Sequence, residues 1–245
     1  WPSLPSDALQ QELDTTPKPG LVDKDNSGGP YRHGLYPHGA QYQVAAPYFV
    51  RLAQLGLSAD KLTTADVQRI GIEAEAAMLR TTHGVNTHRG ALFALGITVA
   101  AAMWLYAHEG QEVRKERLQQ MIQEIAAGFP PSADTHGAEV VAKARVKGAR
   151  ENAVEGYPDL FETWGPYYRK LREDPHRAHR TLLKIMSMLQ DTNIYYRTDA
   201  ETAEIVRQSS GQLLQRFSVN SLREADAEFI RHNISPGGLP PTCSR

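Results

Sequence analysis

From residue 91 to residue 107 the chain reads ALFALGITVAAAMWLYA, and this run sets its architecture. Every residue in it except Gly96 and Thr98 is apolar. A helix over this run has no polar face, and such a helix is buried on all sides. Its 17 positions also fall short of the roughly 20 apolar residues that a transmembrane helix needs. The sequence therefore predicts a buried central helix and no membrane span.

The segment before this helix predicts an anion site. It reads GVNTHRG over residues 84–90, so Asn86 and Thr87 are candidate N-cap residues and Arg89 falls in the first helical turn. A cation is unusual there, because the helix dipole favours acidic residues at an N-terminus. Free backbone N–H groups, a glycine on each side and Arg89 together suit a phosphate. The alternative is a loop that only caps a core helix.

The rest of the chain also has helical periodicity. Segments that carry an apolar stripe are found at about 41–56, 64–81, 112–126, 134–147, 175–195, 200–217 and 221–232. No segment of useful length alternates as a strand does. We therefore expect an all-α protein, a single-domain multi-helix bundle over residues 1–245 around the central helix.

A long loop is expected over residues 14–38, which hold four prolines and four glycines. The rigid turn around Lys18 would hold an ammonium group at a fixed place, which suits a phosphate contact, while Asp23 and Asp25 could bind a hard cation. A solvated surface loop is the alternative.

Further along, Asp191 and Asn193 offer oxygen ligands for Mg²⁺ if a second carboxylate joins them, or else a helix-end cap. Glu73 and Glu75 flank an apolar helix face and need solvent, a cation or a metal.

Charge and cysteine content exclude several classes of protein. With 27 basic and 28 acidic residues, the net charge of −1 offers no general attraction to nucleic acid or to a membrane. The single cysteine, Cys243, excludes an intrachain disulfide framework and a zinc site built on several cysteines. No signal peptide is visible at the start, so we expect a cytoplasmic protein. The oligomeric state is left open.

Several motifs, taken in order, resemble those of the triphosphoribosyl-dephospho-CoA synthase family. They are TTPKPGLVD (15–23), GVNTHRGALFALG (84–96), THG (135–137), GAR followed by Gly156 (148–156), DTN (191–193) and ISPGG (234–238). The resemblance implies an all-helical transferase. It would move the triphosphoribosyl group of ATP to the ribose 2'-hydroxyl of 3'-dephospho-CoA and release adenine. The product is the prosthetic-group precursor of the acyl carrier protein of citrate lyase or malonate decarboxylase.

The resemblance also suggests roles for individual residues. Cleavage of the N-glycosidic bond of ATP passes through an oxocarbenium-like centre, so the protein must hold a triphosphate, assist adenine and activate a hydroxyl. The expected contacts to phosphate or substrate are Lys18, Asn86, Thr87, Arg89, His136, Arg150 and Arg197. The expected catalytic residues are Asp23, Glu75, His88 and Asp191, with Asp23, Asp191 and Asn193 as ligands of Mg²⁺.

The chain also departs from the family pattern. The acidic residue expected near Arg32 is absent, and Asn152 stands where a glutamate is expected, with Glu151 one position earlier. Arg197-Thr198-Asp199 replaces Arg-Gly-Gly, and no apolar helix follows residues 234–238. Two alternatives follow from these departures. One is a diverged enzyme that binds a nucleoside triphosphate but uses another acceptor, and the other is a non-catalytic helical binding protein.

Overall fold

The structure is a computed structural model that describes residues 5–21, 23–25, 40–81, 89–110, 112–131, 147–188, 200–232 and 234. All regular elements within these ranges are helices, and no strand occurs among them. The predicted all-α class is therefore confirmed.

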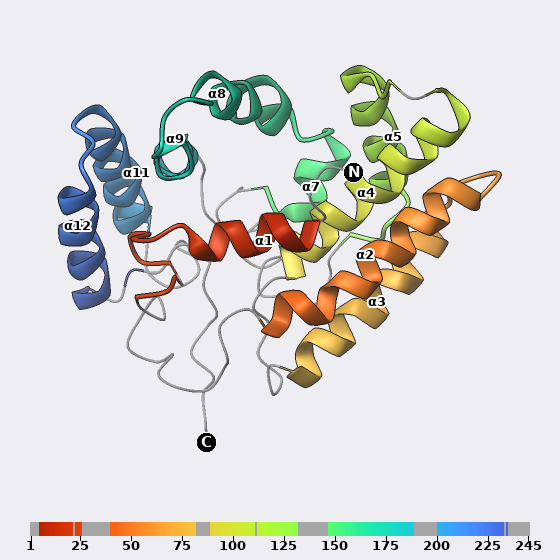
Figure 1. Ribbon diagram of the computed structural model, residues 1–245, viewed down its shortest axis with the longest axis horizontal. Coiled ribbons are helices and arrows are strands. Elements are labelled where there is room, and N and C mark those ends of the chain that lie inside the picture. Colours follow the sequence, from red (N-terminus) through yellow and green to blue (C-terminus); the bar gives the residue numbers. More distant parts are fainter. Residues whose placement is uncertain are drawn as a thin grey trace. The chain divides into compact units, whose positions relative to one another are not determined.

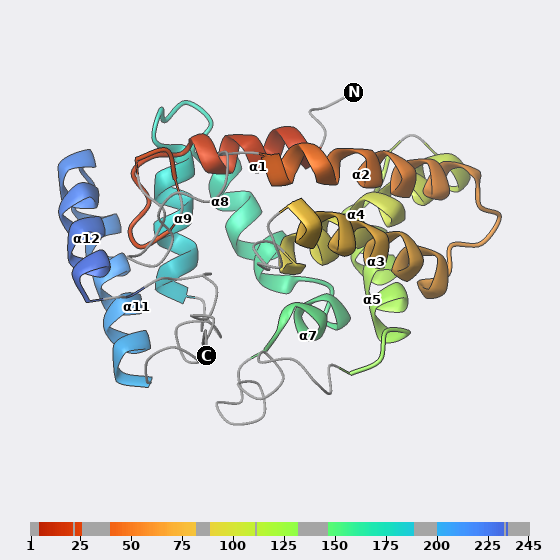
Figure 2. The same ribbon diagram turned by 90° about the horizontal axis from the view of Figure 1, so that it is seen from below.

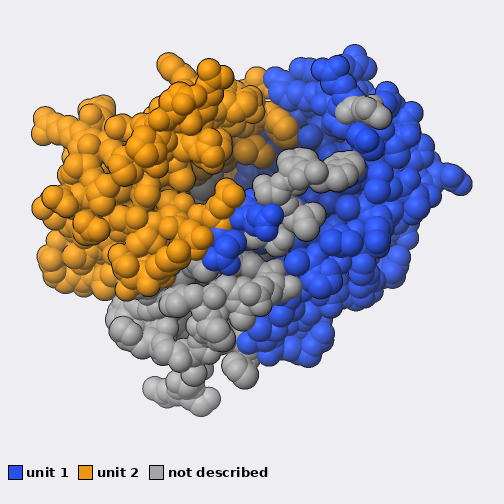
Figure 3. All heavy atoms as spheres, in the orientation of Figure 1, with its two compact units in different colours: residues 1–10, 36–131, 149–158 blue, residues 11–35, 132–148, 159–245 orange. Residues whose placement is uncertain are grey.

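The chain divides into two compact units (Figure 3). Unit 1 comprises residues 1–10, 36–131 and 149–158, and unit 2 comprises residues 11–35, 132–148 and 159–245. Helix α1 (Pro5–Asp14) contributes residues to both units. The chain passes between the units several times, so no single position along the sequence separates them. That they act as one domain stays a prediction.

Unit 1 is built around the predicted central helix, α4 (Arg89–His108). Its other helices are α2 (Ala40–Ser58), α3 (Thr64–Thr81), α5 (Lys115–Ala127) and α7 (Ala149–Val154). Helix α4 packs against all four of them, and Figures 1 and 2 show α2, α3, α4 and α5 side by side. The position of α4 in the middle of this helix group confirms it as the central helix of unit 1.

The buried residues of α4 form one stripe, which consists of Gly96, Ile97, Ala100, Ala101 and Leu105, so the prediction of burial on all sides is wrong. The helix extends beyond the apolar run to 20 residues, which by length and composition is enough to cross a membrane. The sequence argument from insufficient length is therefore wrong. Helix α4 packs against four neighbouring helices, and that it does not span a membrane stays a prediction.

Small residues let α2 and α4 approach closely. A Cβ atom placed on Gly56 of α2 would lie 2.5 Å from the Ala100 carbonyl oxygen on α4, so only glycine fits there. At the same end of α2, the Trp104 indole N–H donates to the carbonyl of Ala59 at 3.0 Å. Between α4 and α5, Arg117 Nε donates to a carboxylate oxygen of Glu109 at 3.0 Å.

The sequence predicts that Thr63 or Thr64 caps helix α3 and that apolar residues on two opposite sides make it an interior helix. Thr63 Oγ1 accepts the N–H of Asp66 at 3.2 Å, a local cap of the first turn. The predicted inner face is buried and consists of Val67, Ile70, Ala74, Ala77 and Met78. The opposite face was expected to be interior too, but Ile72 is 60% exposed. The reason is that Ile72 lies on the side of α3 opposite to its buried residues.

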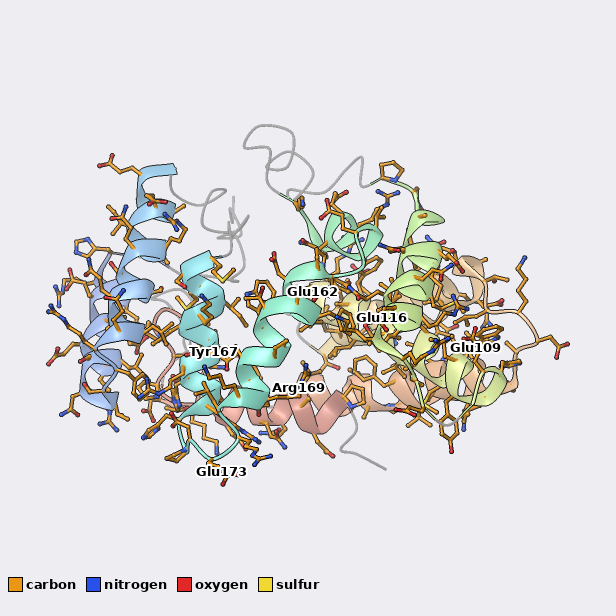
Figure 4. The ribbon with its side chains drawn as sticks, turned by 90° about the horizontal axis from the view of Figure 1, so that it is seen from above. Glu109, Glu116, Glu162, Tyr167, Arg169 and Glu173 are labelled. Carbon is orange, nitrogen blue, oxygen red and sulfur yellow. The ribbon has the colours of Figure 1, made fainter. Side chains whose placement is uncertain are left out.

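Unit 2 holds a second helix group: η1 (Leu160–Trp164, a π-helix), α8 (Gly165–Lys170), α9 (Arg177–Met188), α11 (Ala200–Gln215) and α12 (Val219–Arg231). The core of α9, α11 and α12 is formed by Met186, Ala203, Val206 and Phe229. Figure 4 shows Glu162, Tyr167 and Arg169 along the continuous segment of η1 and α8. Neither this segment nor α1 is among the helices that the sequence predicts.

Candidate functional site

The structure describes five of the predicted site residues and places them in two groups. Glu75, Arg89 and Arg150 belong to unit 1, whereas Lys18 and Asp23 belong to unit 2. The other predicted residues lie outside the described residues: Asn86, Thr87, His88, His136, Asp191, Asn193 and Arg197.

In unit 1 the structure brings Arg89 and Glu75 together. Arg89 is the first residue of α4, and its Nε lies 3.1 Å from Oε1 of Glu75 on α3. The carboxylate offsets the unfavourable interaction between the arginine and the positive end of the helix dipole. The Arg89 side chain is 53% exposed, so its guanidinium group is accessible to a ligand as well as to Glu75.

The neighbouring carboxylate, Glu73, has a different partner. Arg51 of α2 donates a hydrogen bond of 2.6 Å to Glu73, and this bond lowers the pKa of the Glu73 carboxyl group. Both candidate carboxylates on α3 therefore have a cationic partner rather than solvent alone. Glu73 joins two helices of the bundle, whereas Glu75 joins the end of α3 to the start of α4, where the anion site is expected.

Arg150 lies close to the start of α4. A Cβ atom placed on Gly90 would be 3.9 Å from the Cβ of Ala149, so the residues next to Arg89 and Arg150 are in contact. Arg150 Nε donates to the carbonyl of Phe129 at 2.9 Å, and its Nη1 lies 3.7 Å from Oε1 of Glu151. Unit 1 thus presents two arginines on adjacent helix starts, each beside a glutamate.

In unit 2, the residues around Lys18 form an ordered turn. Leu21 N–H donates to the carbonyl of Lys18 at 3.0 Å, and Gly20 has a φ of 69°, which a type II turn requires at its third position. Asp23 is fully buried, and its two oxygens accept the N–H groups of Lys18 at 2.8 Å and of Asp25 at 2.9 Å. The carboxylate of Asp23 therefore stabilises the loop from within.

The Lys18 ammonium group is buried and paired. Its side chain is 1% exposed, and Nζ donates to the Glu12 carbonyl at 2.7 Å and to the Glu12 carboxylate. In this arrangement the ammonium group contacts Glu12, and a phosphate would have to displace that carboxylate. The predicted phosphate contact of Lys18 stays a prediction.

The described residues do not by themselves form a magnesium site. Among them there is no group of three or more histidine, cysteine, aspartate or glutamate side chains that could hold a metal ion. Both oxygens of Asp23 bond to backbone N–H groups, although a carboxylate oxygen can accept more than one contact. The two other predicted ligands, Asp191 and Asn193, lie outside the described ranges.

The structure adds His179, which the sequence analysis did not single out. The His179 ring lies on α9, with its centroid 5.8 Å from that of His176. Both ring nitrogens are buried, and neither forms a hydrogen bond with a residue of the described chain. Burial lowers the pKa of His179, while the nearby backbone of Thr16 and the Asp23 carboxylate act in the opposite direction. His179 therefore lies beside the 15–23 motif, and its three-residue spacing from His176 is the signal that could have indicated it.

Tyr157 is a second addition, at the end of α7 in unit 1. It has a φ of 51°, which is unusual for a residue other than glycine, and it follows Gly156 with a φ of 76°. Its hydroxyl group is buried and has no hydrogen-bond partner in the described part of the chain, and burial raises the pKa of the phenol. Backbone strain of this kind gathers at functional sites, although nothing in the sequence indicated it here.

The comparisons with known proteins agree with the resemblance across nearly the whole chain. The family model described as ATP:dephospho-CoA triphosphoribosyl transferase matches residues 3–239. A probable 2-(5''-triphosphoribosyl)-3'-dephosphocoenzyme-A synthase of Pseudomonas fluorescens is 34% identical over 96% of this chain and 85% of that protein. Its counterpart in Azotobacter vinelandii is also 34% identical, over 94% of this chain and 84% of that protein.

A third relative, from Klebsiella pneumoniae, is named 2-(5''-triphosphoribosyl)-3'-dephosphocoenzyme-A synthase. It is 30% identical over 94% of this chain and 83% of that protein. No solved structure matches the chain.

Proposed function

This chain belongs to the ATP:dephospho-CoA triphosphoribosyl transferase family, and we propose that it transfers the triphosphoribosyl group of ATP to 3'-dephospho-CoA. The observation that carries the proposal is the match over residues 3–239, which includes every motif of the set up to position 238. In this reaction the bond between the ribose C1' of ATP and adenine breaks. A bond forms between C1' and the 2'-oxygen of dephospho-CoA. The hydroxyl group loses a proton, and adenine gains one.

The arginines of unit 1 are proposed to hold the triphosphate. Arg89 is the first residue of α4 and Arg150 the second residue of the adjacent α7, where guanidinium groups and backbone N–H groups can bind phosphate oxygens together. The Arg89–Glu75 ion pair supports this assignment, because it keeps the guanidinium group at the start of α4. In the absence of ATP, Glu75 balances the charge that a phosphate would otherwise neutralise. Glu75 is also proposed as the base that activates the acceptor hydroxyl.

Mg²⁺ is proposed to accompany the triphosphate. Asp191 and Asn193, with Asp23, would supply the oxygen ligands that this ion prefers. When bound, the ion would neutralise part of the triphosphate charge. Asp23 fits this role only in part, since it also bonds to two backbone N–H groups.

The remaining predicted contacts complete the proposal. His88 and His136 would donate to phosphate or adenine, and Asn86, Thr87 and Arg197 would bind phosphate. The protein is proposed to act in the cytoplasm, on small molecules rather than on nucleic acid. Its product would serve the acyl carrier protein of citrate lyase or malonate decarboxylase.

A second candidate function is a related transfer to another acceptor. It is favoured by Asn152, which lies on α7 two residues after Arg150 and stands where the family pattern has a glutamate. An amide cannot accept a proton as a carboxylate does, so the acceptor step would be affected more than ATP binding.

The proposal is tested by measuring adenine release from ATP with and without dephospho-CoA, and with Mg²⁺ or excess chelator. We expect release that depends on both dephospho-CoA and Mg²⁺. Release without dephospho-CoA would favour the second candidate function. ATP binding with no adenine release under any condition would favour a binding protein and contradict the proposal.

A further inference from the structure

Asp226 is a buried carboxylate on α12 that belongs to none of the family motifs quoted above. Its side chain is 8% exposed, and Oδ1 accepts the N–H of Gly20 at 2.9 Å. The two residues are 206 positions apart in the chain and lie in the same unit. A buried carboxylate is costly unless hydrogen bonds stabilise it. The bond from Gly20 therefore indicates a specific role for this side chain.

The backbone of Gly20 needs this partner. The Lys18–Leu21 turn is closed by the N–H of Leu21, so the N–H of Gly20 has to be satisfied by a group outside the turn. Gly20 is buried, and a buried N–H group without a partner costs about as much free energy as a lost hydrogen bond. Asp226 supplies a charged acceptor, which bonds more strongly than a neutral one.

The same loop has a second carboxylate with a different task. Asp23 accepts the N–H groups of Lys18 and Asp25, both within the loop, and so maintains its internal shape. Asp226 instead joins the loop to a helix. The shape of the loop and its attachment therefore depend on different side chains.

Helix α12 also leads directly to another motif. Ile234, the first residue of the 234–238 motif, donates its N–H to the Phe229 carbonyl at 2.8 Å and packs against the core cluster that contains Phe229. That cluster also contains Met186 of α9, the helix after which the chain reaches residues 191–193. The attachment at Asp226 thus links the 15–23 motif to the two helices that lead into the other motifs of unit 2.

We propose that Asp226 is a positioning residue for the transfer reaction. It holds the loop of residues 16–25 in place relative to α9 and α12, and so aligns the motif segments that these elements carry. The part of this inference that concerns kcat rests on the proposed function. Its structural part, the anchoring of Gly20, can be measured without any activity.

The test compares Asp226→Ala, Asp226→Asn and a matched control, Glu224→Ala, which removes an exposed carboxylate from the same helix. Hydrogen exchange of the peptide that contains Gly20 reports on the anchor. Steady-state adenine release, normalised to folded protein, reports on alignment. In Asp226→Ala we expect faster exchange and a kcat that falls by about ten- to a hundredfold, the size of effect of losing one charge-assisted hydrogen bond.

Asp226→Asn keeps an acceptor oxygen of the same shape, so we expect it to fold and to recover most of the kcat and of the exchange protection. Glu224→Ala should match the wild type in both measurements. Unchanged exchange in both Asp226 variants would refute the anchor, and faster exchange with wild-type kcat would refute the positioning role. If Asp226→Ala does not fold, Asp226→Ser takes its place in both measurements, because its hydroxyl oxygen sits one bond closer to the backbone than the carboxylate oxygen that accepts from Gly20. A wild-type protein that releases no adenine would refute the proposed function, while the exchange data would still decide the anchor.

Discussion

Nε of Arg89 lies 3.1 Å from Oε1 of Glu75, and this ion pair joins the start of α4 to α3. In the sequence, the first residues of the family motif 84–96 lie between these two helices. This ion pair contains a proposed phosphate contact and a proposed catalytic residue. A triphosphate that binds Arg89 must compete with Glu75 or share the guanidinium group with it. The effects of substitutions at the two positions should therefore differ in direction.

Arg89→Ala should weaken ATP binding. The loss of one charge-assisted contact costs about 1.5–3 kcal/mol, or roughly ten- to a hundredfold in affinity. Titration of folded protein with ATP measures this. Arg69→Ala is the control, because Arg69 is an exposed arginine on α3 whose ion pairs with Asp66 and Glu73 measure 3.7 Å and 4.0 Å. Equal affinities in the two variants would remove Arg89 from the phosphate site.

Glu75→Gln should separate binding from chemistry. Without the competing carboxylate charge, ATP affinity should stay the same or rise, whereas loss of a general base should lower kcat by about a hundred- to ten-thousandfold. The measurements are ATP titration and adenine release.

Glu73→Gln is its matched control, because Glu73 has the same side chain two positions away and pairs with Arg51. That variant should keep wild-type kcat. If Glu75→Gln also keeps it, Glu75 only neutralises Arg89.

Lys18→Met should destabilise the fold. The substitution removes a buried ammonium group and its hydrogen bonds to Glu12, at a cost of about 1.5–3 kcal/mol. Lys24→Met, which removes an exposed ion pair with Asp14, should cost less than about 1 kcal/mol. Urea denaturation followed by circular dichroism compares them.

The same Lys18 variant tests the phosphate contact. We expect folded Lys18→Met to bind ATP more weakly than Lys24→Met does. Wild-type ATP affinity in Lys18→Met would show that this lysine is structural only.

Gly56→Ala and Gly71→Ala should change stability in opposite directions. At Gly56 the added Cβ would lie 2.5 Å from the Ala100 carbonyl oxygen, so we expect destabilisation of about 1–3 kcal/mol or more. At Gly71 the added Cβ would have no atom of the described chain within 4 Å apart from the backbone of its own helix, and alanine should stabilise helix α3 by about 0.4–1 kcal/mol. Thermal unfolding provides the comparison. A stable Gly56→Ala variant would contradict the close packing of α2 and α4.

Asn152→Glu should accelerate transfer if the departure at this position slows the acceptor step. The added carboxylate would restore the residue type that the family pattern has there, with a gain in kcat of up to about a hundredfold and little change in ATP affinity. Single-turnover adenine release with dephospho-CoA measures the effect. If the unaltered protein already transfers rapidly and the variant shows no gain in kcat, the asparagine at position 152 does not slow the acceptor step.

Local patterns in the sequence determined the helices and the main packing faces. The apolar run at 91–107 indicated the central helix, and Thr63 with its neighbours indicated the start of α3. Such predictions succeed because helical periodicity and N-capping involve residues only a few positions apart. The π-helix η1 and helix α8 were missed, because Pro158, Gly165 and Pro166 read as breaks in the pattern.

The sequence also named five described residues of the candidate site, but not what each contacts. Lys18, Asp23, Arg89 and Arg150 were identified by their type and motif, and Glu75 by its place beside an apolar helix face. Only the tertiary structure paired Arg89 with Glu75, buried Lys18 against Glu12 and joined Gly20 to Asp226. It also left Ile72 exposed. The physical reason is that burial and ion pairing depend on which helix faces meet, and residues as far apart as Gly20 and Asp226 carry no local signal of their contact.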